Sequence, residues 1–277
     1  MKHSGLEKRM REYEDVFRFH LPKRMPVIIR VDGRAFHTFT REFKRPFDEV
    51  LRTTMQLTAK KLCEEVSGCK LAYVQSDEIS LLVTNDDSVE TQPWFGNGMW
   101  KLVSLTAAIA TLEFNKVLPV AIDNWGRKTL PDWEEGGTNE DVDPELLKRL
   151  DAYNRGFAHA TFDSRAFVLP KEEVCNYFIW RQQDAVRNSI QMVAQSLYSH
   201  KELQNKNSDD LQEMIFQKGV NWNDYPIDCK RGACVIRTEK EVNGVLRHKW
   251  EVDMEIPTFT KDRNYIEGRF IHEEDHQ

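Results

Sequence analysis

The chain has few cysteines and lacks the paired spacings of a metal or redox motif. Its 277 residues include five cysteines, an odd number with no C-x-x-C pair. Disulfide frameworks belong to oxidising compartments and to small, cysteine-dense secreted domains. The cysteine pattern therefore favours a reducing, cytoplasmic compartment and disfavours a structural zinc site.

Long apolar runs and an excess of positive charge are also missing. The longest apolar stretch, near residues 105–112, is far shorter than the roughly 20 residues of a bilayer span. The charged N-terminus lacks the apolar segment of a secretory signal. A net charge of -6 excludes a polycationic nucleic-acid coat but allows an enzyme with a local basic groove. We expect a soluble, cytoplasmic, globular protein with no membrane partner.

What is present is a mixture of helix and strand patterns. Helices are expected over 7–20, 48–66 and 100–114, from Pro144 onward, and over 171–200; strands are expected over 27–33, twice within 71–83, and around 166–169, 233–237 and Trp250. The acid- and glycine-rich segment 125–143 predicts a loop, and its acids lack the ligand alternation of an EF-hand. We place a soft boundary there, between an N-terminal portion, 1–136, and a C-terminal portion, 137–277.

Acidic residues occur where two of these strands end. Asp32 ends the strand over 27–33, and Asp77 and Glu78 lie at the tip of a hairpin. If the strands are neighbours, the carboxylates converge at one sheet edge. Mg²⁺ prefers oxygen ligands and often takes one or two carboxylates, with substrate phosphates completing its shell, and paired ions catalyse phosphoryl displacement. The alternative, from spacing alone, is two ordinary acidic turns.

Basic residues lie close to Asp32 in the sequence. Arg30 and Arg34 flank it, and Arg41, Lys44 and Arg45 follow. Such groups would bind triphosphate oxygens beside a metal site, or would form a solvated basic loop.

Two further sets of polar residues have equally open interpretations. Lys101 and Ser104 share a face of an apolar helix, where a lysine either extends to solvent or faces an anion. For His37, packing competes with general-base and metal-ligand roles. On the helix over 171–200, a polar stripe suits stacking and forked hydrogen bonds to a nucleic acid or nucleotide, although a solvated face would also explain it; it comprises Tyr177, Arg181, Asp184 and Asn188, beside Trp180 and Gln182.

Six blocks in this order resemble the tRNA(His) guanylyltransferase superfamily of 3′-to-5′ nucleotide-adding enzymes. They are RVDGRAFH at 30–37, RPFD at 45–48, AYVQSDE at 72–78, FDSR at 162–165, WRQQD at 180–184 and KRG at 230–232. The resemblance implies an α+β fold with a polymerase- or cyclase-like palm, a ferredoxin-like antiparallel sheet with helices on one face, plus helical and β additions. It also implies two Mg²⁺ ions, ATP, GTP and other nucleoside triphosphates as substrates, tRNA as partner, and a homotetramer formed as a dimer of dimers.

The resemblance also implies residue roles by position. Asp32, Asp77 and Glu78 would be catalytic, with Asp32, Asp77 and the Gly33 carbonyl as metal ligands. The implied nucleotide-binding residues are Arg30, Arg34, Phe36, His37, Arg45, Asp48, Ser76, Lys101 and Ser104. The implied tRNA-binding residues are Arg165, Arg181, Asp184, Asn188, Lys230 and Arg231. The family commonly has lysine where this chain has Arg45, which keeps the charge.

One departure from the family pattern concerns the branch. In the guanylyltransferases proper, a His-Ile-Asn-Asn stretch follows the WRQ-x-D block, whereas this chain has Val186-Arg187-Asn188-Ser189. The missing histidine resembles the guanylyltransferase-like branch, which repairs 5′-truncated tRNA by template-directed addition. We therefore expect an enzyme that activates the tRNA 5′ end with ATP and adds nucleotides there.

Three other functions remain as alternatives. The first is addition of an extra guanosine to histidine tRNA. The second is a nucleotidyl cyclase-like enzyme, which would not need the polar stripe or the KRG block. The third is a non-catalytic tRNA-binding module, which would gain nothing from clustered acids that repel phosphate.

Overall fold

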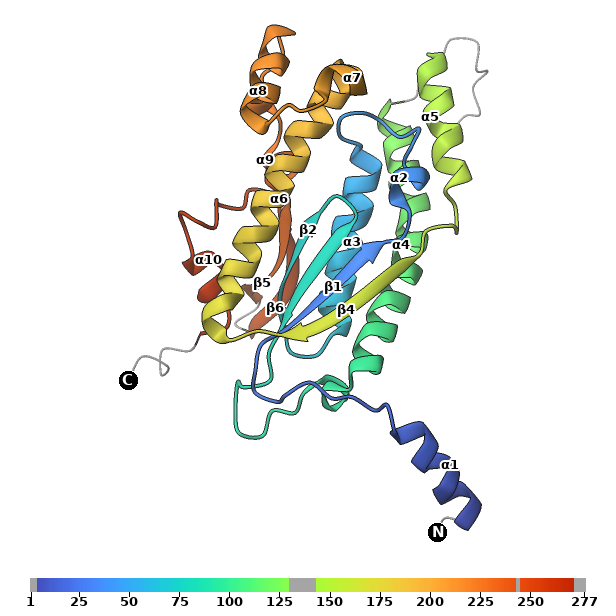
Figure 1. Cartoon of the computed structure of the whole chain (residues 1–277), viewed down its shortest axis with the longest axis vertical. Helices are drawn as coiled ribbons and strands as arrows, with labels where there is room; N and C mark the ends of the chain where they lie inside the picture. The colour runs from blue at the N-terminus through green and yellow to red at the C-terminus, as the bar shows by residue number, and fades with distance from the viewer. Residues whose placement is uncertain (1–3, 130–142, 243–244, 272–277) are drawn as a thin grey trace.

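A six-stranded antiparallel sheet forms the centre of the structure, a computed structural model that describes residues 4–129, 143–242 and 245–271 (Figure 1). The strand order is β4-β1-β3-β2-β5-β6. The strands are β1 (Val27–Gly33), β2 (Cys69–Gln75), β3 (Glu78–Val83), β4 (Phe162–Val168), β5 (Ala233–Val242) and β6 (Val245–Asp253). Strands from both expected portions of the chain thus pair in one sheet.

Helices surround this sheet, except for the first one, which projects away from it (Figure 1). They are α1 (Gly5–Asp15), α2 (Phe36–Phe39), α3 (Glu49–Glu65), α4 (Met99–Thr129), α5 (Pro144–Arg155), α6 (Lys171–Leu197), α7 (His200–Leu203), α8 (Ser208–Gln217), α9 (Ile227–Arg231) and α10 (Asn264–Glu267), with short 3-10 turns η1 (Trp94–Asn97) and η3 (Trp222–Asp224). The mixed α and β content and the antiparallel sheet confirm the broad fold class.

Both faces of the sheet are covered, which corrects the expectation of helices on one face. Val27, Ile29 and Val31 point into a core shared with α3 and α4, whereas Ile28 points into a second core shared with α6. Figure 1 shows α6 on one side of the sheet and α3 and α4 on the other. A strand buried on both sides is apolar at consecutive positions, as β1 is at its start.

Helix α4 is longer than its pattern predicted, because it continues through Pro119 to Thr129. The segment expected to form a loop from residue 125 is therefore helical at its start, and residues 130–142 lie outside the described part. By length and composition alone α4 is long enough to cross a membrane, contrary to our expectation. Core helices of soluble proteins meet the same criterion, and Leu102, Ala110, Phe114 and Leu118 of α4 are buried.

The structure confirms the predicted starts of two helices, which rest on clear sequence signals. Helix α3 begins at the N-cap Asp48, whose side chain accepts a hydrogen bond from the Leu51 N–H at 2.9 Å. Helix α5 begins after the N-cap Asp143. The helices α7 to α10 were not predicted; α8 packs on the C-terminal half of α6 through Leu211 and Ile215.

Candidate active site

The two predicted metal ligands lie side by side at one edge of the sheet. Asp32 is next to last in β1, and Asp77 lies in the two-residue turn between β2 and β3. The Gly33 N–H donates a hydrogen bond of 3.0 Å to the Asp77 carbonyl oxygen, which joins the strand end to the turn. Because β1 pairs directly with β3, with Asp32 opposite Glu78, the expected convergence of the carboxylates is confirmed.

Both carboxylates have raised pKa values. Burial raises the pKa of Asp32 most, and the negative charges of Asp77, Glu78 and Asp163 raise it further. Burial likewise raises the pKa of Asp77, with a further contribution from Glu78. A bound cation would relieve this repulsion.

These two carboxylates fit Mg²⁺ better than a metal that needs a full protein cage. Within the described residues, no group of three or more His, Cys, Asp or Glu side chains is placed to hold a metal. Mg²⁺ is commonly held by one or two carboxylates together with water and substrate phosphates. Two carboxylates without further protein ligands are therefore enough for Mg²⁺.

A pocket of about 530 Å³ opens beside the carboxylates. Asp32, Asp77, His37 and Arg45 line it, so the two predicted carboxylate metal ligands meet predicted nucleotide-binding residues there. A smaller pocket of about 370 Å³ extends from the same carboxylates along α6, and its walls include Glu78, Arg181 and Asn188. The walls of both pockets also include Ser76, Met192 and Gln195.

Sequence reasoning missed Met192 and Gln195, although it found the stripe to which they belong. They continue the polar stripe of α6 beyond Asn188 at intervals of four and three residues. Their regular spacing was the available signal.

Phe36 and Asp48, both predicted to bind nucleotide, have supporting positions. The Phe36 ring is only 3% exposed and packs against Phe39, Phe114 and Phe162. A side chain at Gly33 would begin 2.4 Å from that ring, so Gly33 and Phe36 fit together only without a Cβ. These contacts hold the end of β1, which carries Asp32, in place.

Asp48 is buried and uses its carboxylate to order the loop that carries Arg45. It caps α3, accepts a hydrogen bond of 2.9 Å from the Lys44 N–H, and accepts one of 2.7 Å from the Tyr153 hydroxyl. Burial raises the pKa of Tyr153, and the Asp48 charge adds to the effect. The Asp48 side chain therefore positions the loop, and because it also lines the carboxylate pocket its nucleotide contact stays a prediction.

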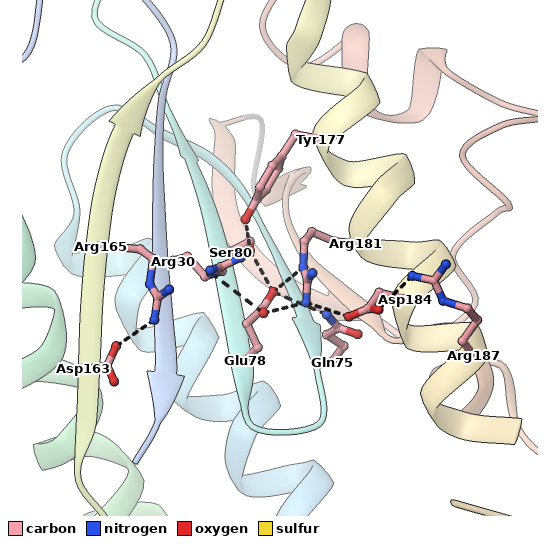
Figure 2. A network of polar contacts seen from close by, with 10 residues as sticks. All are labelled: Arg30, Gln75, Glu78, Ser80, Asp163, Arg165, Tyr177, Arg181, Asp184 and Arg187. Atoms are coloured by element: carbon pink, nitrogen blue, oxygen red, sulfur yellow. Dashed lines mark hydrogen bonds and ion pairs between the residues drawn. The ribbon is translucent and has the colours of Figure 1, made fainter. Parts of the chain in front are cut away.

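Glu78, predicted to be catalytic, is the centre of a buried ion-pair network (Figure 2). Its two oxygens accept forked hydrogen bonds from Arg181 Nε at 2.8 Å and Nη2 at 2.7 Å. Ser80 Oγ lies 3.3 Å from Glu78 Oε1 and 2.9 Å from the Tyr177 hydroxyl. Such bidentate pairs are strong and directional. The Glu78 carboxylate therefore holds α6 against the sheet, and because Glu78 also lines the smaller pocket its catalytic role stays a prediction.

Three arginine and aspartate side chains that we assigned to ligands belong to the same network. Arg30 Nε lies 4.0 Å from Glu78 Oε2, which places this predicted phosphate ligand inside the protein. Arg181 and Asp184, predicted to bind tRNA, pair with each other at 3.2 Å, and Asp184 also pairs with the exposed Arg187 at 2.9 Å. Arg181 and Asn188 of the predicted stripe line the smaller pocket, and of these two Asn188 is exposed.

Lys230 and Arg231 of the KRG block hold α9 to its neighbours. Tyr73 donates a hydrogen bond of 2.6 Å to the Arg231 carbonyl, and Ser189 donates one of 3.0 Å to the Lys230 carbonyl. Arg231 Nε donates to the Ile256 carbonyl at 3.1 Å. At least part of this block's role is therefore structural.

The remaining predicted residues lie outside the two pockets. Arg165 pairs with Asp163 at 3.3 Å on β4, and its charge lowers the pKa of Asp32. Arg34 is exposed just beyond β1. Lys101 and Ser104 are exposed near the start of α4, at the end of the sheet opposite the β2–β3 turn (Figure 1).

The antiparallel sheet, the paired carboxylates where its strands end, and the adjoining pocket lined by Lys44 and Arg45 fit a nucleotidyltransferase. Comparison with known families gives the particular kind. The profile of the family described as Thg1, tRNAHis guanylyltransferase, matches residues 7–170, and the chain belongs to this family. This confirms the resemblance found in the sequence blocks.

Individual relatives agree with this assignment. The tRNA(His) guanylyltransferase of Debaryomyces hansenii is 28% identical over 225 residues, which span 76% of this chain and 73% of the relative. A solved bacterial tRNA(His) guanylyltransferase (Thg1)-like protein in complex with ATP is 43% identical with a TM-score of 0.76, covering 96% of this chain and 99% of that one. A GTP complex of a protein with the same description is 41% identical with a TM-score of 0.75, covering 97% and 100%.

Proposed function

We propose that this chain is a 3′-to-5′ nucleotidyltransferase that activates the 5′-monophosphate of a truncated tRNA with ATP and then adds nucleotides by pairing with the opposite strand. The 3′-hydroxyl of the incoming nucleotide would attack the activated 5′ phosphate. The observation that carries the proposal is the meeting of Asp32 and Asp77 beside a pocket lined by Arg45 and His37.

The sheet supports interpretation as a polymerase-like palm. The central neighbours β1 and β3 are antiparallel, and they bring one acidic residue from a strand end beside another from a hairpin turn. Asp32 and Asp77, with the Gly33 carbonyl, would hold two Mg²⁺ ions, which would neutralise phosphate charge and activate the attacking hydroxyl. Arg45 and His37 would orient the triphosphate. Ser76, in the turn between β2 and β3, lines the same pocket.

The substrates follow from the pocket and from the relatives. Solved structures of bacterial Thg1-like proteins contain ATP in one case and GTP in another. The pocket of about 530 Å³ is of the size that small-molecule ligands occupy. We propose ATP, GTP and other nucleoside triphosphates as substrates and tRNA as the acceptor. The five cysteines are all free, which supports action in the cytoplasm.

A homotetramer would give Lys101 and Ser104 access to a nucleotide. Within one chain they lie near the start of α4, which Figure 1 shows at the end of the sheet opposite the β2–β3 turn. Their predicted nucleotide contact therefore requires that α4 of one copy approach the pocket of another.

Val186 favours repair over addition of guanosine to histidine tRNA. Its side chain is partly buried against the cluster of α6 and α8 residues that includes Ile190. Valine offers no hydrogen bond to a tRNA end, so base pairing must select the nucleotide. The alternative, guanosine addition to intact histidine tRNA, is favoured by the names of the curated relatives, such as that of D. hansenii.

A direct competition tests the choice. A tRNA lacking its first 5′ residue and a full-length histidine tRNA, both with 5′-monophosphates, would compete for the enzyme with Mg²⁺ and all four nucleotides. We expect complementary filling of the truncated end to be faster. Faster guanosine addition to the full-length tRNA would contradict the repair proposal, and no addition to either would contradict the nucleotidyltransferase assignment to tRNA 5′ ends.

A further inference from the structure

Helix α1 lies apart from the rest of the chain. Figure 1 shows it projecting from the end of the molecule opposite the β2–β3 turn. All 11 residues of α1 are at least partly exposed to solvent. Isolated helices shorter than about 12–15 residues are only marginally stable in water. Packing against a partner would therefore stabilise α1.

One face of α1 is apolar and faces solvent. Leu6, Met10 and Tyr13 follow one another at intervals of four and three residues, and Phe17 continues the spacing just beyond the helix. Residues at these intervals share one face of a helix. Their exposed fractions are 60%, 44%, 70% and 58%. A continuous apolar row in water marks an interaction surface.

The charges of α1 run against the direction that favours an isolated helix. Three bases precede three acids: the bases are Lys8, Arg9 and Arg11, and the acids are Glu12, Glu14 and Asp15. The helix macrodipole favours acids near the start and bases near the end. A second copy of α1 in antiparallel orientation would place the bases of each helix beside the acids of the other. A parallel copy would place like charges together.

The same charges disfavour a membrane as the partner. With Glu7 included, α1 has four acids and three bases, a formal charge of -1. Helices that lie on membranes are rich in lysine and arginine, which attract anionic lipids. A charge pattern that complements itself suits a two-fold contact, in which both subunits use the same surface.

We propose that α1 is a dimerisation element through which two copies of this chain pair, antiparallel about a two-fold axis between Met10 and Tyr13. Leu6 of one copy would lie opposite Phe17 of the other, and Met10 opposite Tyr13. Arg9 would lie beside Glu12 of the other copy on one flank of this row. In the homotetramer proposed above, this contact would be one of the interfaces, and it involves no residue of the carboxylate pocket.

The interface would extend beyond α1. Stable interfaces take about 20–30 residues from each partner, more than the 11 of this helix. The Met99 N–H donates a hydrogen bond of 2.9 Å to the Phe19 carbonyl, which ties the segment after α1 to the start of α4. Near this junction Phe19, Phe95 and Trp100 are 56%, 52% and 57% exposed. The apolar surface of α1 therefore continues onto the body of the chain.

The test is the mass of the full chain in solution, measured by sedimentation equilibrium over a range of concentrations. Met10→Asp and Tyr13→Asp should each lower the association constant at least about tenfold, because a two-fold contact places the new charge in the apolar row twice. Phe216→Asp is the control, since Phe216 is 65% exposed on α8 at the other end of the molecule (Figure 1). It should change the constant less than about twofold. A monomeric parent, or Met10→Asp that associates like the parent, would overturn the proposal.

A charge exchange tests the antiparallel register. Arg9→Glu and Glu12→Arg should each weaken association about threefold to tenfold, because like charges would then lie side by side. Both changes in one chain should restore association to within about twofold of the parent. Arg9→Glu adds an acid near the start of α1, which favours the isolated helix, so its effect on association would not come from a weaker helix. Without restoration in the double variant, the antiparallel register is wrong.

Two further measurements separate this inference from other partners and from the proposed chemistry. The parent should not sediment with vesicles of phosphatidylserine and phosphatidylcholine. Vesicle binding that Met10→Asp removes, with no change in mass, would make a lipid surface the partner and overturn the proposal. An associating parent that adds no nucleotide to truncated tRNA would refute the proposed function alone, and a monomeric parent that adds nucleotides would refute the α1 contact alone.

Discussion

Asp77 and Glu78 are neighbours in the chain, yet they lie in opposite electrostatic settings. Asp77 lines an open pocket, and its pKa is raised by burial and by the charge of Glu78. Glu78 is buried and receives a forked pair of hydrogen bonds from Arg181. The carboxylate without a fixed cation is the one available to a metal, and the carboxylate with one holds α6 against the sheet.

The largest expected effect is on catalysis, from removal of a carboxylate in the open pocket. Asp32→Ala or Asp77→Ala should each lower the rate of nucleotide addition at least about a thousandfold, because a metal ligand supplies several kcal/mol of charge stabilisation. The melting temperature should stay close to that of the parent, since repulsion between acids is relieved. Single-turnover addition at saturating Mg²⁺ measures the first quantity.

The control for these variants is Asp163→Asn, an exposed carboxylate whose charge also acts on Asp32. It should retain activity within about threefold. A turnover of Asp77→Ala within tenfold of the parent would remove the metal-ligand assignment, because tenfold is only about 1.4 kcal/mol.

The next effect is on stability, from breaking the buried pair. Arg181→Gln should lower the free energy of unfolding by about 3–5 kcal/mol, because it leaves Glu78 buried without its partner. Arg187→Ala removes an exposed ion pair on the same helix and should cost less than about 1 kcal/mol. Urea unfolding gives both values.

A double variant sharpens this comparison. Glu78→Gln together with Arg181→Gln should be more stable than Arg181→Gln alone, because no charge is left unpaired. If the two single losses simply add, the pair does not act as a unit, and Glu78 regains its claim to a role in the open pocket.

The same contrast explains how much the sequence could predict. Strand ends and the hairpin turn are local features, so the positions of Asp32 and Asp77 follow from apolar runs that stop at Gly33 and at the 75–78 tip. The partner of Glu78 lies about a hundred residues away on α6, and no local pattern indicates it. Sequence reasoning therefore grouped three acids that do line one pocket, but it could not show that Glu78 is paired with Arg181.

The polar stripe of α6 also shows what sequence spacing can and cannot predict. Its spacing correctly predicted that Tyr177, Arg181 and Asn188 share a face. The tertiary packing of α6 on β3 decides which of these residues contact the sheet and which line the pocket. Arg52 and Asp228 were missed for that reason too, since they meet only when α9 packs beside α3.

A smaller effect is expected on nucleotide affinity, from the loop that Asp48 orders. Arg45→Ala should raise the KM for ATP roughly tenfold or more, because a charge-assisted contact is worth about 1.5–3 kcal/mol. Binding of tRNA should change less than about twofold. Arg41→Ala is the matched control, an exposed arginine of the same loop that does not line the carboxylate pocket. A loss confined to tRNA binding would move Arg45 from the nucleotide to the acceptor.

The smallest effect is expected from Lys101, because it would reach the nucleotide as a single point charge on another copy's helix. Lys101→Ala should weaken ATP use by about threefold to tenfold. The Lys101→Ala variant can be mixed with the Asp77→Ala variant under conditions that exchange subunits. The mixture should regain affinity for ATP, because each Asp77→Ala chain supplies an intact Lys101 to a neighbouring Lys101→Ala chain, whose carboxylates are intact. Chains carrying both substitutions should restore nothing. If Lys101→Ala weakens ATP use and mixing leaves it unchanged, the lysine acts within its own chain, and the exposed start of α4 is no approach to a neighbouring pocket.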